Sequence, residues 1–310
     1  MTTHFIVTPV RNAVRTIDAT IWSIVSQLGD LDIRYHVQDG GSTDGTLDRI
    51  QAWAARIEQM SNPLIARVHF TFDSRPDSGM YDAITSAFSK MAIPSDAFMN
   101  WCNADDALWP GALEAVSRIG KDLPDTEWIT GWPAWFDNLN RFSALDRTPR
   151  YPHALIAAGL ADGIHWPFIQ QESSFWRKRL WDKAGGLDTS LRLAGDWDLW
   201  VRFAQSTPLV HVHRQLGAFY MRPGQQSSDM SRYRSEMDSK LGLSSRKRAL
   251  RPLVMQSLSL TTVPVAMEDD SSRWQLTYRN CSRRAGLLAF ALRSLPMVTP
   301  NLSKLFYKIW

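Results

Sequence analysis

The chain has 310 residues, of which 44% are hydrophobic and 21% are charged, and its formal net charge is +4. This composition excludes a disordered or collagen-like chain and predicts a sizeable core. The length fits one large domain or, as we favour, a domain of about 200 to 250 residues with a C-terminal appendix. The two cysteines, Cys102 and Cys281, are too few for a disulfide framework or a zinc cluster.

The expected compartment follows from signals that the sequence lacks. The start, MTTHFIVTPVRN, has no basic head or long apolar stretch of the kind found in a secretory signal. The apolar runs are shorter than the ~18 to 20 residues of a membrane-spanning helix. We therefore expect a cytoplasmic protein.

Short β-rich runs alternate with amphipathic stretches in the first half of the chain. HFIVTPV precedes a helix from about Thr16, RYHVQD precedes a helix from about Thr46, and ARVHFTF follows. Apolar residues recur at helical spacing, as in Ile17, Ile21 and Ile24. This βαβαβ rhythm predicts an α/β fold in which both helices pack on a sheet.

The second half is less regular. From about Thr126 it is rich in tryptophan and contains one clear helical stretch, near residues 195–204. After about Asp229 the sequence is basic and Ser-rich, and residues 281–310 contain five Arg or Lys and no acidic residue. We predict a domain over residues 1–228 and a basic helical extension over residues 229–310.

The segment QDGGSTDGT places Asp39 at the end of a predicted strand, before two glycines that permit positive φ. A carboxylate in such a turn can accept hydrogen bonds from a base edge, for example from the imide N–H of uracil. The alternative is an Asx turn followed by a helix N-cap, since these residue types are common in turns.

NADD, residues 103–106, follows the apolar run DAFMNWCN, which is typical of a buried strand. In open α/β sheets, ligands bind beyond the carboxyl ends of the strands. Asp105 and Asp106 supply the oxygen ligands that Mg²⁺ or Mn²⁺ prefers when phosphates and water fill the other positions. The alternative is a solvated turn at the end of a strand.

Two further segments carry candidate residues. In SRPDSGMYDAI, Arg75 can contact a phosphate, and Asp77 lies in a tight turn where capping is an equally good explanation. In LAGDWDLWVRF, Asp196 begins a helix with an apolar face and can act as a general base. It can equally be an N-cap, and a helix N-terminus lowers the basicity of a carboxylate.

Taken in order, the segments TPVRN, QDGGSTDGT, SRPDSGMYDAI, NADD, SSFWRKRLWDKAGGLD, AGDWDLWVRF and RPGQQSS resemble family 2 glycosyltransferases of the GT-A fold. Each motif is weak alone, but seven in this order, over residues 4 to about 228, are specific. The resemblance implies a nucleotide-sugar-binding half, residues 1–106, and an acceptor half, residues 107–228.

The resemblance also implies roles for individual residues. Asp105 and Asp106 would hold Mn²⁺ or Mg²⁺ on the diphosphate, and Asp196 would be the base of a single inverting displacement. The nucleotide pocket would be formed by Thr8, Pro9, Asn12, Asp39, Arg75, Asp77, Asn103, Ala104 and Asp105.

The sequence departs from the family pattern at two positions. Asn103 stands where many members have the first Asp of an acidic triplet, and Gly195 stands where many have Glu before the catalytic Asp. The first departure concerns the number of metal ligands. The second leaves Asp196 without an acidic neighbour in sequence.

The expected partners follow from the same resemblance. They are a nucleoside-diphosphate sugar, with UDP favoured, and a glycan or lipid-linked acceptor in surface polysaccharide synthesis. The basic C-terminus is compatible with peripheral contact at the inner face of the cell membrane.

The open alternatives are another nucleotide-using α/β transferase and a non-catalytic nucleotide-sugar-binding protein. Neither G-x-G-x-x-G nor a P-loop follows a predicted strand, which argues against a dinucleotide dehydrogenase or a P-loop enzyme. A nucleic-acid partner is not expected, because only the sequence pI of 9.1 favours one.

Overall fold

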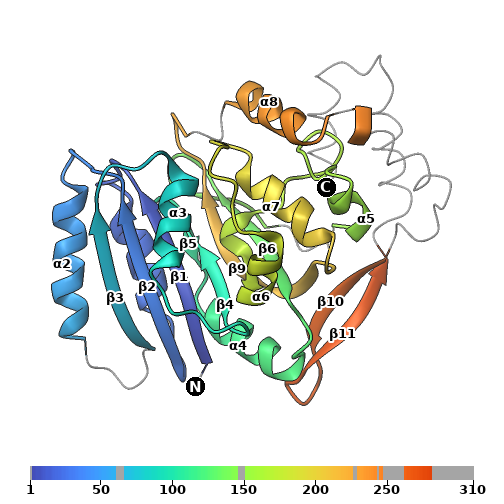
Figure 1. Cartoon of the computed structure of the whole chain (residues 1–310). Helices are drawn as coiled ribbons and strands as arrows, with labels where there is room; N and C mark the ends of the chain where they lie inside the picture. Colours follow the sequence, from blue (N-terminus) through green and yellow to red (C-terminus); the bar gives the residue numbers. More distant parts are fainter. Residues whose placement is uncertain are drawn as a thin grey trace.

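The computed structural model describes residues 2–60, 66–145, 151–225, 229–242, 244–246 and 262–280. Over these residues the chain forms one mixed sheet with helices on both faces (Figure 1). The strands are β1 Thr2–Val10, β2 Leu31–Asp39, β3 Arg67–Ser74, β4 Phe98–Trp101, β5 Ala107–Leu108, β6 Trp128–Phe136, β7 Phe142–Leu145, β8 Ser174–Arg177, β9 Val210–Tyr220, β10 Thr262–Glu268 and β11 Trp274–Asn280. The helices are α1 Ile17–Val25, α2 Thr46–Glu58, α3 Met80–Ser89, α4 Ala112–Asp122, α5 His153–Ala157, the 3₁₀ helix η1 Gln171–Ser173, α6 Lys178–Ala184, α7 Gly195–Ala204 and α8 Met230–Lys240.

The order of the strands places several carboxyl ends at one edge. The main path is β11-β10-β9-β6-β8-β4-β1-β2-β3, with β5 paired to β9 and β7 paired to β6. Strands β1, β2, β3 and β4 are mutually parallel, and β8 runs antiparallel to β4. The segments that follow β1, β2, β3 and β4 therefore leave the sheet on the same side, where ligands bind in such sheets.

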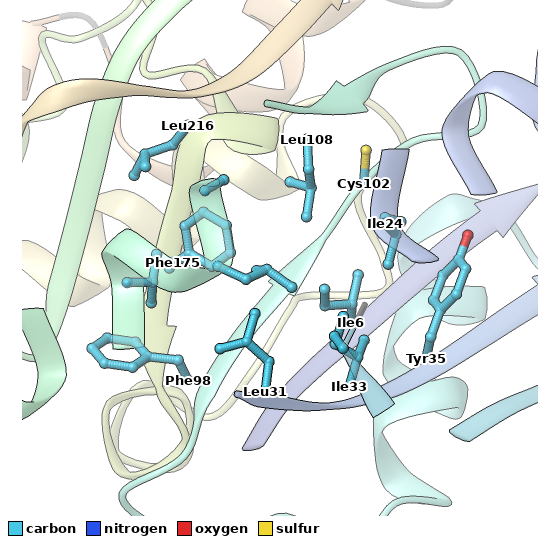
Figure 2. Packing of buried hydrophobic residues seen from close by; sticks show 14 of the residues in the cluster. Ile6, Ile24, Leu31, Ile33, Tyr35, Phe98, Cys102, Leu108, Phe175 and Leu216 are labelled. Carbon is cyan, nitrogen blue, oxygen red and sulfur yellow. The ribbon is translucent and has the colours of Figure 1, made fainter. Parts of the chain in front are cut away.

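Each face of the sheet has its own core. Alternate residues of β1 point to opposite faces, so that Ile6 packs with α1, α2 and α4 while Val7 packs with α3, α6 and α7. Figure 2 shows the first core, in which Ile6, Ile33 and Phe98 lie among buried aliphatic side chains. The helices predicted from Thr16 and Thr46 begin at Ile17 and Thr46, with their apolar stripes buried.

The second core is built around tryptophan. The Trp101 and Trp200 rings stack with centroids 5.8 Å apart, and Trp200 stacks on Trp128 at 5.3 Å. Trp176 meets Trp101 edge to face at 5.1 Å. All four side chains are buried, so Trp101 and three tryptophans of the second half hold β4, β6, β8 and α7 together.

The described residues after position 228 are helical only in part. Helix α8 lies against α7, but residues 262–280 form a hairpin, β10 and β11, in which β10 extends the sheet beside β9 (Figure 1). Two contacts join this hairpin to α4. Arg118 Nη1 lies 2.8 Å from Glu268 Oε1, and the backbone N–H of Trp274 donates to Asp122 Oδ2 at 2.9 Å. This corrects the expectation of a helical appendix.

The predicted basic tail, residues 281–310, lies outside the described residues. In the part of the chain that the structure describes, no helix is long and apolar enough to cross a membrane.

Candidate active site

The loop after β1 is fastened to the loop after β2. The Asn12 N–H donates to Ser42 Oγ at 2.8 Å, and Asn12 Oδ1 accepts from the Thr43 N–H at 2.9 Å. Asn12 adopts a φ of +54°, a left-handed conformation that asparagine tolerates. The two loops therefore form one unit at the edge of the sheet.

Asp39 is the last residue of β2, and its side chain is fully buried. The carboxylate accepts from the Ser42 N–H at 3.1 Å and from Ser74 Oγ at 2.6 Å. It also bonds to the Ser42 hydroxyl. Two serines therefore hold the Asp39 carboxylate, Ser42 from the turn after β2 and Ser74 from the end of β3. These hydrogen bonds fit the turn explanation of the motif, and contact with a base stays a prediction.

The loop after β3 lies over the glycines of the same turn. A Cβ at Gly40 would come within 2.5 Å of Asp77 Oδ2, so a larger residue there would displace the Asp77 carboxylate. Asp77 Oδ1 also accepts from the Gly79 N–H at 2.9 Å. The Arg75 guanidinium bonds to Ser86 on α3 and lies 3.6 Å from Asp73 Oδ2. Asp77 therefore lies beside the turn that follows Asp39, and the Arg75 guanidinium contacts Ser86 and Asp73 instead.

Thr8 and Pro9 lie within β1 and are buried. The Thr8 hydroxyl pairs with the Tyr35 hydroxyl at 2.9 Å inside the core. Any contact of Thr8 with a ligand would therefore come from its backbone.

The acidic motif after β4 divides into an outer and an inner carboxylate. Asp105 is partly exposed, and its Oδ2 accepts from Gln225 Nε2 at 2.9 Å. Asn103 is also partly exposed, whereas Ala104 is buried. Asp105 therefore remains the carboxylate of this motif that is open to a ligand.

Asp106 faces the protein interior. It is 2% exposed, and its oxygens accept from the Tyr220 N–H at 3.2 Å and from Asn103 Nδ2 at 3.2 Å. Burial and the nearby charges of Glu172 and Asp105 raise the pKa of Asp106 well above its usual value. The structure thus separates the two expected metal ligands and gives Asp106 hydrogen bonds that join the acidic turn to β9.

Glu172 is a buried carboxyl group that the sequence did not single out. It lies in η1, its side chain is fully buried, and neither of its carboxyl oxygens has a hydrogen-bond partner among the described residues. Burial, with smaller contributions from the charges of Asp105 and Asp196, raises the pKa of Glu172 to about 8. The charges of Asp105 and Asp196 therefore both act on the Glu172 carboxyl.

Asp196 begins α7 and is half-buried. Its Oδ1 accepts from the Tyr233 hydroxyl at 2.8 Å and from the Trp197 N–H at 2.8 Å. Burial raises the pKa of Asp196 to about 6, and these hydrogen bonds oppose that rise. A pKa near 6 suits a base that must be ionised at neutral pH and still accept a proton.

Four carboxyl groups from three parts of the chain influence one another through their charges: Asp105, Asp106, Glu172 and Asp196. Asp106 Oδ2 lies 3.5 Å from Nε2 of Gln171, the neighbour of Glu172 in η1. Within the described residues, no Lys or Arg forms an ion pair with any of them. Carboxyl oxygens are the ligands that a divalent cation such as Mg²⁺ or Mn²⁺ prefers. The same residues contain no group of three His, Cys, Asp or Glu that could hold a metal by themselves.

Sequence patterns identified the candidate residues in the turns but not the residues that contact them. Glu172 sits in an irregular stretch without periodicity, and Tyr233 lies beyond the predicted domain. Gln225 belongs to the RPGQQSS segment, which gave no hint of a contact with Asp105.

Comparisons with known proteins show the family and the fold. Residues 5–179, more than half of the chain, match the family model described as Glycosyl transferase family 2. A search of the curated proteins finds no match.

Solved structures of similar fold include residues 1–349 of TarS from S. aureus in complex with UDP-GlcNAc. That superposition has a TM-score of 0.55 and 13% sequence identity, and it covers 84% of this chain and 73% of that one. The mannosyltransferase PcManGT from Pyrobaculum calidifontis, in complex with GDP-Man and Mn²⁺, aligns with a TM-score of 0.48 and 13% identity, over 99% of this chain and 79% of that one. The likeness to TarS confirms the α/β fold of the GT-A type. By its family match, the chain belongs to glycosyl transferase family 2 and is a glycosyltransferase.

Proposed function

We propose that the protein is a metal-dependent, inverting glycosyltransferase that moves a sugar from a nucleoside diphosphate to an acceptor hydroxyl. One observation carries the proposal. Asp105 follows β4, which is parallel to β1, β2 and β3, and Asp196 lies 3.5 Å from the hydroxyl of Tyr81 in α3, the helix that follows β3. In this proposal Asp105 serves the diphosphate side of the site and Asp196 serves the acceptor side.

The donor side consists of the loops after β1, β2 and β3. Asp39 is oriented by Ser42 and Ser74 and can accept the N–H of a base edge, which favours uridine. Asn12 and Asp77 shape the same loops. We therefore propose UDP as the nucleotide carrier.

Asp105 would hold the metal on the diphosphate, with phosphate oxygens and water as its other ligands. Mg²⁺ and Mn²⁺ sites of this kind use only one or two protein carboxylates, which fits the single outer carboxylate here. The bound ion would offset the charge that develops on the departing diphosphate. Asp106, bonded to Tyr220 and Asn103, would fix the turn beneath Asp105.

Asp196 would take the proton from the acceptor hydroxyl as its oxygen attacks the anomeric carbon of the sugar. With a pKa of about 6, the carboxylate is mostly ionised at pH 7. No side chain needs to form a covalent intermediate. A single displacement inverts the anomeric configuration.

The test is a panel of nucleotide sugars with Mn²⁺, assayed for diphosphate release and transfer. Asp196→Asn should lose at least about 100-fold in rate, since positioned bases contribute about 10² to 10⁴. Asp105→Ala should also lose activity, because it removes the carboxylate that would hold the metal. Asp48→Asn, which changes an exposed carboxylate in the first turn of α2, should behave as the native protein.

Two results would contradict the proposal. Native rates in folded Asp196→Asn would remove the base assignment. A product whose anomeric configuration matches the donor, measured by NMR, would exclude a single inverting displacement.

We also propose that the acceptor is a glycan or lipid-linked sugar of surface polysaccharide synthesis, used at the inner face of the membrane. The five basic residues and the absence of acidic ones in residues 281–310 support this contact. Deleting residues 281–310 should release the protein from anionic liposomes. Unchanged partitioning would refute the membrane role.

A further inference from the structure

The start of α7 is held by a helix that follows it in the chain. No side chain of its own caps α7, whose N-cap residue is Ala194. Instead, Glu236 Oε2 of α8 accepts from the N–H groups of Arg192, Leu193 and Ala194, at 2.9, 2.8 and 3.1 Å. Burial opposes the charge of Glu236, but these donors hold its pKa below the usual value. A charged group on α8 therefore fixes the backbone that leads into Asp196.

The same helix contacts the Asp196 carboxylate directly. The Tyr233 hydroxyl donates to Asp196 Oδ1 at 2.8 Å, and the Tyr233 side chain is 7% exposed. Its ring packs edge to face against Phe168, with centroids 5.1 Å apart. Burial and the nearby Asp196 raise the pKa of Tyr233 well above its usual value, so that it stays a donor at every physiological pH.

A second tyrosine, Tyr81, also contacts the start of α7. Tyr81 of α3 donates to the Leu193 carbonyl at 2.6 Å, and its ring fills the space where a Cβ on Gly195 would stand, 2.6 Å from Cε2. A glutamate at position 195 does not fit beside this buried ring. The Tyr81 ring therefore occupies the space of the side chain that the family pattern would place next to Asp196, and Tyr233 bonds to the carboxylate from α8.

We infer that α8 belongs to the catalytic machinery, with Tyr233 as the positioning residue that orients the Asp196 carboxylate and Glu236 as the group that holds the start of α7. This inference rests on the proposed role of Asp196 as the base. Helix α8 lies beyond residues 5–179, which match the family model, and beyond the predicted domain boundary at residue 228.

The titratable groups around Asp196 come from three elements: Tyr81 of α3 and Tyr233 of α8 contact its carboxylate, and Glu172 of η1 is affected by its charge. Glu236 of α8 binds the N–H groups of the residues shortly before Asp196. Among these, Tyr233 makes the shortest hydrogen bond to the carboxylate, at 2.8 Å against 3.5 Å for Tyr81. A donor of this kind stabilises the ionised form and lowers its pKa. Removing it should therefore make the base titrate at higher pH.

The test compares the pH profile of sugar transfer by the full-length native protein and by Tyr233→Phe, which keeps the ring and removes the hydroxyl. We expect the acidic limb to move up by about one pH unit, equivalent to about 1.4 kcal/mol. From a pKa of about 6, the rate would fall about fivefold at pH 6 and stay nearly unchanged at pH 8. Tyr278→Phe, at a 69% exposed position on β11, should keep the native profile.

Glu236→Ala supplies an independent measurement. Without the acceptor for three N–H groups, the start of α7 should shift, and the rate should fall at least about fivefold even at pH 8, with binding of UDP unchanged. A native rate in this variant would overturn the role of α8.

The outcomes separate the inference from the function on which it rests. A native acidic limb in folded Tyr233→Phe overturns the positioning role while Asp196→Asn remains inactive. Native rates in Asp196→Asn overturn the base assignment itself. If the native protein transfers no sugar at any pH, the proposed function fails, and the direct titration of Asp196 by NMR in native protein and Tyr233→Phe still decides whether the hydroxyl lowers its pKa.

Discussion

Replacing Glu172 by Gln should make the protein more stable at alkaline pH. The Glu172 carboxyl is fully buried, and its oxygens have no hydrogen-bond partner among the described residues. Its pKa is raised from 4.5 to about 8, chiefly by burial. The folded state therefore keeps a proton that the unfolded chain releases, and stability is lost as pH rises from about 4.5 to about 8.

The size of this effect follows from proton linkage. Each pH unit over which the folded state alone is protonated costs about 1.4 kcal/mol. Between pH 6 and 8 the loss amounts to roughly 2 kcal/mol, because the carboxyl begins to ionise in the folded state as well. Glutamine has nearly the same shape and does not ionise, so the Glu172→Gln variant should escape this loss.

The assay is urea unfolding followed by tryptophan fluorescence at pH 6, 7 and 8. The stability difference between Glu172→Gln and native protein should grow by roughly 2 kcal/mol over this range. Glu114→Gln on α4, whose side chain is 55% exposed, should show a constant difference. If the native protein and Glu172→Gln lose stability in parallel with pH, Glu172 is ionised throughout and the reasoning is refuted.

Three further changes test the packing and the donor side. Gly195→Ala should destabilise the protein by about 1 to 3 kcal/mol in thermal unfolding, because the new methyl group meets the buried Tyr81 ring, although alanine usually favours a helix; an unchanged or higher Tm would contradict this. Trp200→Ala should cost about 3 to 5 kcal/mol in urea unfolding, because it empties the centre of the tryptophan cluster, and a cost below about 1 kcal/mol would mean that the cluster collapses around the gap. Asp39→Asn should weaken UDP binding about tenfold in calorimetry, since one charge-assisted hydrogen bond is lost, and equal affinity would remove Asp39 from the base pocket.

Local patterns in the sequence were enough for the framework of the donor half. The spacing of Ile17, Ile21 and Ile24 predicted α1, and these three residues are buried. The helix predicted near residues 195–204 is α7, at Gly195–Ala204. These features depend on residues a few positions apart, which periodicity reports directly.

The surroundings of the candidate site depend on contacts between distant residues. Tyr233 of α8 donates to Asp196, and Gln225, in the segment that follows β9, donates to Asp105. The inward turn of Asp106 follows from its bond to Tyr220 in the sheet. No local pattern records such pairings, because they are decided by the way in which strands and helices far apart in the chain are packed together.

The position of α8 in the chain has a consequence for protein synthesis. A nascent chain emerges from its N-terminus, so the loop around Asp39 can form while α8 is still inside the ribosome. Until Tyr233 emerges, Asp196 lacks the hydroxyl that orients it. An unfinished chain would then hold the loop around Asp39 without an aligned base, and transfer would begin only once α8 had emerged.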